Sequence, residues 1–416
     1  MLLALIVAGP AAAQEGGESI RGVLEAIEGD LREPVAGIEI IVSEPGGAEV
    51  DRAISNDAGV WEIPVPGPGT YQVELVEASL PDGITMTDPD RRVLDNVSVR
   101  AGQNKTVRFS LGPGVSSTVG TWSRVGGLFI IGLKFGAIIA LASVGLSLVF
   151  GVVGLVNFAH GDMVTLGAVL AFFLNASPLG PEWHVLLAAI PAILLVAAFG
   201  GVQERYLWRP LRNAQVSLIS MLVISIGLSF AIRYLILVVV GGNPRPYADF
   251  SVQDRIDILG ISTVPKNLVI IAFTLVVLAL VGLFLQRTRL GTAMRAVSDN
   301  SDLAESSGID VRRVVLVTWV MGSALAALGG VMFGISEQVQ WDMGFRLLLL
   351  IFSAVILGGL GTAFGAMLGG FIVGIAVEMS TLWIPVEFKT AVALGILVLM
   401  LLVRPQGLLG SRERIG

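Results

Sequence analysis

Long apolar segments dominate the chain from about residue 124 onward. A helix that crosses a lipid bilayer needs about 20 consecutive, mostly apolar residues. Over the whole chain the hydrophobic share is 54%, the charged share is 14% and the mean hydropathy is +0.80. We therefore predict a multi-pass α-helical membrane protein with eight or nine transmembrane helices within residues 124–408, the apolar segments lying at 125–150, 151–175, 185–203, 215–240, 267–286, 314–335, 347–360, 364–384 and 389–403.

Arginines are concentrated in three hydrophilic breaks between these segments, at 204–213, 286–313 and 404–414. Connections rich in lysine and arginine remain on the cytoplasmic side of a membrane. The breaks and the tail at 409–416 are therefore predicted to be cytoplasmic. With an odd number of spans, the N-terminal region then lies outside.

The region before the apolar segments has a different periodicity. Between residues 19 and 111, apolar side chains alternate with polar ones, as in Ile38, Ile40 and Val42, and turn sequences separate the alternating stretches. This pattern predicts short β-strands that form a small all-β sandwich at 15–112. A linker follows at 113–123.

The turn and strand sequences Asp-Ala-Gly-Val-Trp at 57–61 and Pro-Gly-Thr-Tyr at 68–71 resemble a carboxypeptidase-regulatory-like or transthyretin-like module. This resemblance implies a fold and little about function. Residues 1–13, before the module, contain an apolar stretch and a small-residue cleavage site like those at the end of a secretory signal peptide. They lack the positively charged start of such a signal. They are either a truncated signal peptide, which would place the β-domain outside, or a frayed apolar tail.

Composition excludes several classes of function. The chain has no cysteine and only two histidines, so disulfides, thiolate chemistry, iron–sulfur clusters and a histidine-built metal centre are not expected. The acidic residues of 15–112 do not have the spacing of a calcium loop and are better explained as a solvated acidic face. No clustered basic, aromatic-rich surface for nucleic acid is present.

A polar sequence interrupts the first two apolar segments. Asn157, His160 and Asp162 flank Gly161 at a depth where polar groups facing lipid would be costly. These residues either line a transport pathway or simply cap the second helix, and the residue types alone favour neither reading.

Glycines are dense at 358–370, and Gly358, Gly359 and Gly361 are their first members. They permit either close helix packing or a break in the helix beside a pathway, opposite the polar sequence. Glu378 is the best candidate for a proton- or sodium-coupling carboxylate, although a position near the membrane surface explains it better. Lys134 and Arg233 can extend their charges to the surface.

Five ordered motifs carry a stronger resemblance. Gly-Leu-Val-Asn-Phe-Ala-His-Gly-Asp at 154–162 is similar to a signature of branched-chain amino acid ABC importer permeases of the LivH type and of related urea-type permeases. The other motifs lie at 204–212, 289–297, 353–362 and 404–410. The resemblance covers essentially the whole membrane region, whereas the β-domain is an addition to it.

The resemblance implies import of branched-chain amino acids or a similar small polar solute such as urea. It also implies three kinds of partner, namely a second homologous permease, two cytoplasmic ATP-binding subunits and an extracytoplasmic solute-binding protein. The segment 287–313 would contact the ATPase, with Arg295, Asp299, Leu303, Glu305 and Gly308 as the contact residues. Without the family resemblance, the sequence of this segment indicates a solvated amphipathic connector.

No Gly-x-x-x-x-Gly-Lys-Ser/Thr sequence occurs, so the chain is not predicted to be an enzyme or to hold ATP by that route, and any ATP is used by partner subunits. A channel or secondary transporter that works without ATP is the alternative function. A sensor with the β-domain as its functional part is a further one.

Overall fold

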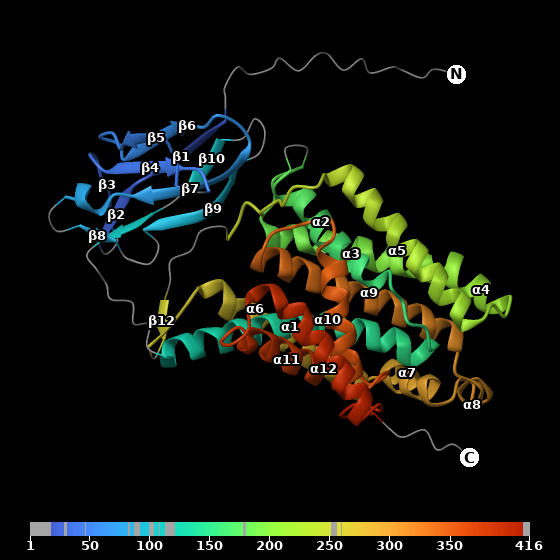
Figure 1. Ribbon diagram of the computed structural model, residues 1–416. Helices are drawn as coiled ribbons and strands as arrows, with labels where there is room; N and C mark the ends of the chain where they lie inside the picture. Colours follow the sequence, from blue (N-terminus) through green and yellow to red (C-terminus); the bar gives the residue numbers. More distant parts are fainter. Residues whose placement is uncertain are drawn as a thin grey trace, which may run out of the picture. The chain divides into compact units, whose positions relative to one another are not determined.

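The computed structural model describes residues 18–28, 31–45, 47–81, 84–86, 92–99, 104–107, 109–112, 121–177, 180–250, 256–258 and 260–410. The chain divides into two compact units, 1–120 and 121–416. Strands build the first unit and helices build the second (Figure 1). The predicted signal peptide at 1–13 lies outside the described residues. So does most of the predicted linker, whose last three residues belong to the first helix.

The described residues of the first unit form three sheets. The strands in their spatial order are β10 (Asn104–Val107), β1 (Ser19–Val23) and β6 (Val60–Pro64) in one sheet, β3 (Leu31–Pro34), β2 (Glu25–Glu28), β11 (Ser110–Gly112) and β8 (Thr85–Met86) in another, and β5 (Glu49–Ile54), β4 (Glu39–Ser43), β7 (Gly69–Leu75) and β9 (Val93–Val99) in the third. Alternate residues of β4 and β7 are buried in one core that also contains Trp61. The predicted β-domain is therefore confirmed.

The alternation at 107–111 predicts one strand, but the structure contains two. Val107 ends β10, which pairs with β1, while Leu111 lies in β11, which pairs with β2 and β8. The chain passes from one sheet to another here. Both residues stay buried because the sheets share one core, so periodicity alone could not reveal the change.

Among the described residues of the second unit, nine apolar helices form a bundle, and shorter elements connect them. The apolar helices are α1 (Thr121–Val153), α2 (His160–Asn175), α3 (Val185–Gln203), α5 (Leu218–Val240), α6 (Pro265–Arg287), α9 (Val311–Ser336), α10 (Met343–Gly358), α11 (Ala363–Ser380) and α12 (Lys389–Val403). The connecting elements are the π-helical turn η3 (Glu204–Trp208), α4 (Arg209–Asn213), the hairpin of β12 (Ile256–Ile258) and β13 (Ile261–Thr263), α7 (Arg289–Asp299), α8 (Ser301–Ser306) and the short helix η4 (Val386–Phe388).

Within the described residues, seven helices are long and apolar enough to cross a membrane. The other two apolar helices, α2 and α10, have sixteen residues each. A sixteen-residue helix is about 24 Å long, shorter than the roughly 30 Å hydrocarbon core of a bilayer. Each predicted apolar segment thus corresponds to a helix, but α2 and α10 begin inside the bundle.

The hydrophilic sequence at 204–213 is helical rather than a break. η3 and α4 continue α3 without interruption to Asn213. The helix can continue because the fully buried Glu204 carboxylate pairs with Arg209 and Arg212 from the next turns. The predicted end of the third span at residue 203 therefore marks a change in polarity and not the end of a helix.

Close helix contacts surround α1 and α9, the two most buried spans. They run antiparallel, since Gly145 contacts Gly322 and Ala142 lies near Gly329. On its other side, α1 packs against Gly370 and Gly374 of α11. Small residues at these positions allow the backbones to approach closely.

The same order of elements occurs twice in the bundle. A long helix, a short connection and a sixteen-residue helix are formed first by α1 and α2, and again by α9 and α10. The two parts touch reciprocally: Gly145 faces Gly322, and Gly161 faces Gly344, so that a side chain on any of these glycines would meet the carbonyl oxygen of its partner. Such an inverted arrangement with interrupted helices is typical of membrane transporters.

Candidate functional site

The polar sequence that precedes α2 turns back into the bundle. α1 ends at Val153, and Gly154 has a positive φ of 71°. Asn157 is buried, and its side-chain oxygen accepts a hydrogen bond from the backbone N–H of Ala159 at 3.1 Å. The adjacent Phe158 packs edge-to-face on Phe352 of α10. This turn allows α2 to start in the interior of the bundle.

Asp162 is fully buried and bonded to a different helix. Its two carboxylate oxygens accept hydrogen bonds from Ser229 at 2.5 Å and from the Arg233 guanidinium at 3.2 Å, both on α5. The guanidinium also lies 3.7 Å from the centre of the Phe345 ring of α10. The cluster therefore joins α2, α5 and α10 through one compensated pair of charges.

This geometry does not fit capping of α2 by Asp162, nor surface placement of Arg233. The N-cap of α2 is Ala159, whose own side chain makes no capping bond, whereas the Asn157 side chain accepts from the Ala159 N–H. Asp162 bonds to α5 instead, and Arg233 is buried beside it rather than extended to the membrane surface.

His160 and Gly161 fix the crossing of the central helices. The His160 ring nitrogen Nε2 lies 2.9 Å from the carbonyl oxygen of Ala142 in α1, and the ring is buried. Gly161 leaves room for the backbone of Gly344 at the start of α10, whose N–H donates to the Thr165 hydroxyl at 3.0 Å. The starts of both sixteen-residue helices thus meet inside the bundle.

Gly358, Gly359 and Gly361 lie at the C-terminal end of α10, where Gly361 contacts Gly151 near the end of α1. Gly359 and Gly361 have positive φ values of 112° and 78°, so the helical conformation is interrupted between α10 and α11. The segment 406–410 fills this break. The N–H groups of Leu408 and Leu409 donate to the carbonyls of Leu357 and Gly358 at 2.8 and 2.9 Å. The structure therefore shows both a break and close packing, but does not bring these glycines together with Asn157, His160 and Asp162.

The predicted coupling segment forms two helices, α7 and α8, each with a side-chain cap. The Thr288 hydroxyl caps α7 and the Asn300 amide oxygen caps α8. Arg295, Asp299, Leu303, Glu305 and Gly308 are all exposed. Leu303 of α8 lies among polar residues, and 66% of it is accessible.

Contacts of α7 connect it to the ends of three other helices. The Ser298 hydroxyl donates to the Gly151 carbonyl of α1 at 2.7 Å. A cavity of about 270 Å³ lies between α7, α1, α6 and the break after α10, and is lined by Arg295, Asp299 and Gly361 among others. Two groups of residues that the sequence suggested separately are therefore neighbours at this end of the bundle.

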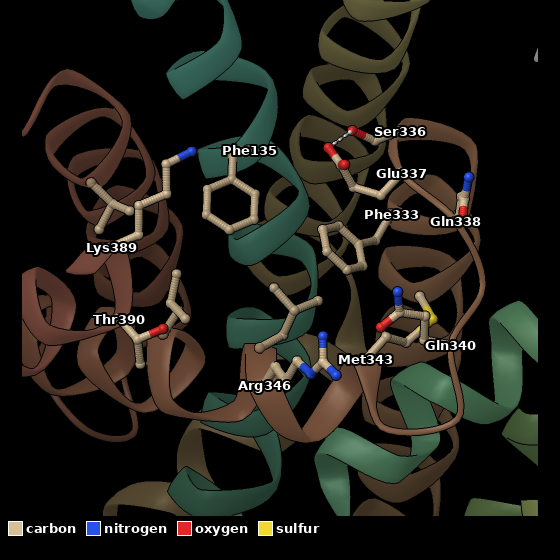
Figure 2. A pocket seen from close by; sticks show the side chains of 13 residues that line it. Phe135, Phe333, Ser336, Glu337, Gln338, Gln340, Met343, Arg346, Lys389 and Thr390 are labelled. Atoms are coloured by element: carbon tan, nitrogen blue, oxygen red, sulfur yellow. Dashed lines mark hydrogen bonds between the residues drawn. The ribbon is translucent and has the colours of Figure 1, made fainter. Parts of the chain in front are cut away.

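A second cavity, of about 480 Å³, opens at the opposite end of the bundle (Figure 2). Its apolar wall includes Phe135 of α1, Phe333 of α9, Leu347 and Leu350 of α10, and Val377 of α11. Its polar side chains include Glu337, Gln340, Arg346 and Lys389. We call it the opposite-end cavity.

The charged side chains at the opposite-end cavity differ in their pairing: the two cations are in ion pairs, whereas Glu337 is not. The Lys389 ammonium bonds to both oxygens of Glu378 at 2.8 Å, and Arg346 pairs with Asp342 at 2.8 Å. Glu337 accepts only a 3.2 Å hydrogen bond from Ser336 among the described residues, and makes no ion pair within 4.0 Å there. Lys134 lies near enough to Glu337 and Glu378 for their charges to interact.

Sequence reasoning identified Glu378 and Lys134 singly but missed this cavity. Its lining comes from five helices and the connection between α9 and α10, spread over residues 135–390. The one local signal was the polar sequence Ser-Glu-Gln-Val-Gln at 336–340 between two apolar helices. The Glu378 carboxylate, considered above for proton or sodium coupling, is bound to Lys389.

The loop 241–250 lies on the same side of the bundle as the opposite-end cavity and packs against the C-terminal end of α2. The Asp249 carboxylate accepts from the Asn175 amide at 2.7 Å and from the Val185 N–H at 2.8 Å. Tyr247 is buried and donates to the carbonyl of Ala168 at 2.9 Å. Burial raises the pKa of the Tyr247 hydroxyl, so it stays protonated and can keep donating at any physiological pH.

No group of three or more His, Cys, Asp or Glu side chains that could hold a metal ion occurs in the described part of the chain.

Residues 128–401 match the family model described as the branched-chain amino acid transport system permease component. The β-domain lies outside this match.

Several permeases are similar to the chain over the same region. The high-affinity branched-chain amino acid transport system permease protein LivH of Escherichia coli (strain K12) is 32% identical over 294 residues, covering 68% of this chain and 94% of LivH. The corresponding protein BraD of Pseudomonas aeruginosa is 34% identical over 299 residues, with the same coverage of both chains. LivM of E. coli, named as a permease of the same kind, is 26% identical over 295 residues, covering 65% of this chain and 67% of LivM. No solved structure matches the chain.

Proposed function

Because this chain belongs to the family of branched-chain amino acid transport permeases, the membrane components of ABC importers, we propose that it translocates branched-chain amino acids or a similar small polar solute. It is a multi-pass inner-membrane protein. In our proposal two separate ATPase subunits power the transport. A second homologous permease completes the pathway, as the names of LivH and LivM in one organism suggest. An extracytoplasmic binding protein delivers the solute.

The exposed α7–α8 pair is the observation that carries this proposal. Leu303 presents an apolar side chain to solvent beside Glu305, and Arg295 and Asp299 are exposed on the preceding helix. Exposed apolar and charged side chains thus lie together on this pair of short helices, and a surface of this mixed composition can dock a partner protein. We assign these residues and Gly308, whose positive φ of 85° ends α8, to contact with the ATPase.

Contacts at α7 supply a mechanical route from the ATPase to the spans. Movement of α7 would act on α1 through the Ser298–Gly151 hydrogen bond, and on the α10–α11 break through Gly151, which contacts Gly361. Gly358, Gly359 and Gly361 then form a joint between two helices that move as rigid bodies. Asn157, His160, Gly161 and Asp162 lie beside the pathway or its inner gate, where the starts of α2 and α10 meet.

Orientation follows from the arginines of the α7–α8 end. Arg205, Arg209 and Arg212 follow α3, Arg287 and Arg289 join α6 to α7, Arg312 and Arg313 begin α9, and Arg404 follows α12. By the positive-inside rule this end is cytoplasmic. The opposite-end cavity, the loop at 241–250 and the β-domain are then extracytoplasmic.

The test is purification of the tagged chain from its own host, followed by uptake of leucine into proteoliposomes that contain the recovered complex. We expect two ATPases, a second permease and a binding protein to co-purify, and uptake to require ATP. Recovery of this chain alone, with flux that ignores ATP, would instead identify a channel or facilitator.

A further inference from the structure

We propose that the opposite-end cavity is a binding site for a zwitterionic amino acid with an apolar side chain. The cavity would receive the solute after the binding protein releases it. This inference rests on the proposed function, since it names the place where this chain itself holds the transported solute.

Size and lining fit such a ligand. The volume of about 480 Å³ is within the range of roughly 300–1,000 Å³ that small-molecule sites have. Phe135 and Phe333 face the space from two helices, with ring centres 6.2 Å apart, and Leu347, Leu350 and Val377 extend the apolar wall (Figure 2). A branched aliphatic side chain placed there loses contact with water, which favours binding.

Cationic groups border this wall and can receive the ligand carboxylate. Lys389 lies at the cavity with its ammonium fixed by Glu378, and Arg346 is held by Asp342. An ammonium has three N–H donors and a guanidinium has five, so each cation has donors left after pairing with its protein carboxylate. The pairing also holds both cations in place before the ligand arrives.

Glu337 provides the complementary group for the ligand ammonium. Its carboxylate has one hydrogen bond, from Ser336, and no ion pair among the residues that the structure describes. It lies across the apolar wall from Lys389 (Figure 2). The cavity thus offers an unpaired carboxylate, cations whose charge is partly compensated, and an apolar surface between them.

This combination discriminates by chemistry. An amino acid with a branched side chain can satisfy all three features at once. Urea has no charge and no apolar group, so it would leave Glu337 and the apolar wall unmatched. The cavity therefore favours a branched-chain amino acid over urea, the two solute classes that the family resemblance left open.

The first test separates solute handling from docking of the binding protein. In the purified complex, Glu337→Gln is expected to lower leucine uptake per ATP hydrolysed by about tenfold, the size expected for one lost charge-assisted hydrogen bond. The KM for the leucine-loaded binding protein reports docking and should not change; a raised KM with unchanged uptake per ATP would instead place Glu337 in the docking surface and overturn this inference. Glu337→Asp should restore part of the uptake. Glu182→Gln, which removes an exposed carboxylate outside the cavity, is the matched control and should behave as wild type.

A second test uses the absence of cysteine from the chain. Gln340→Cys places a single thiol at the cavity, and Ser98→Cys places one on the exposed surface of the β-domain. A cationic methanethiosulfonate reagent should label the first more slowly when the complex holds leucine and its binding protein, but not with urea. Labelling at residue 98 should ignore both solutes.

The outcomes distinguish the two proposals. If the wild-type complex takes up neither leucine nor urea with ATP, the proposed function fails; if it takes up urea but not leucine, only this inference is overturned. If the wild type transports leucine while Glu337→Gln keeps full uptake per ATP and leucine does not protect residue 340, the cavity is not the solute site and only this inference is overturned.

Discussion

The Asp162–Arg233 ion pair links α2 to α5 where both side chains are buried. Burying a charge is costly unless an opposite charge and hydrogen bonds compensate it, and here Ser229 bonds to both partners. Removal of one partner should therefore be worse than removal of both.

We expect Asp162→Asn to destabilise the protein by about 3–5 kcal/mol, because the Arg233 guanidinium would stay buried without a counter-charge. The double variant Asp162→Leu, Arg233→Leu should lose less. Thermal unfolding of the purified protein in detergent measures both effects. Equal loss of stability in the single and the double variant would show that the ion pair is not what matters at this site.

Glycine positions differ in the space around them, which gives a second prediction at this scale. A side chain at Gly344 would overlap the carbonyl of Gly161, whereas Gly227 of α5 has no heavy atom within 4 Å of such a side chain. Gly344→Ala should prevent normal folding because both partners of the contact are backbone. Gly227→Ala should keep or raise stability by up to about 1 kcal/mol through helix propensity. Detergent-stable monodisperse yield compares the two, and similar yields would contradict the close contact.

Helices and their connections show how the sequence determines elements of this bundle. The nine apolar helices of the described residues could be predicted, because each contains a run of apolar residues that is visible in the sequence. The continuation of α3 through 204–213 could not be predicted, since it depends on the buried Glu204 carboxylate meeting Arg209 and Arg212. Nor could the internal start of α2 and α10, which depends on contact between residues as distant as Gly161 and Gly344.

The element that we assign to energy coupling is α7–α8, and it can be tested apart from transport. Glu305→Arg reverses an exposed charge without touching a buried residue. If α8 docks on the ATPase, binding of the ATPase should weaken about tenfold or more, or at least 1.4 kcal/mol. Co-purification of the binding protein should persist, because it would dock at the other end. ATPase recovery equal to that of wild type would remove α8 from the interface.

Whole-molecule organisation separates the β-domain from the family region. The domain has its own hydrophobic core, and the match to the permease family begins at residue 128. Deletion of residues 15–112 should therefore leave ATP-driven leucine uptake in place, measured in proteoliposomes against the full chain. Complete loss of uptake by a protein that still assembles with its ATPases would favour the β-domain as the functional part.

At this scale the sequence predicted the β-domain followed by a helical membrane part, because periodicity and hydropathy change sharply between them. It also supplied the exposed residues of α7–α8, through family motifs. The opposite-end cavity could not be predicted, because Phe135, Glu337 and Lys389 come together only when distant helices pack. The local sequence pattern thus predicted the strands and helices, whereas the opposite-end cavity forms only through tertiary packing.

The closure of the α10–α11 break by Leu408 and Leu409 has a consequence for biosynthesis. The carbonyls of Leu357 and Gly358 acquire these N–H partners only after the ribosome has added α11, α12 and the following residues. Until then that end of α10 carries two backbone acceptors without these donors, which is costly inside a membrane. The joint that we assign to energy coupling is therefore among the last parts of the permease to mature, so an incomplete chain would lack it.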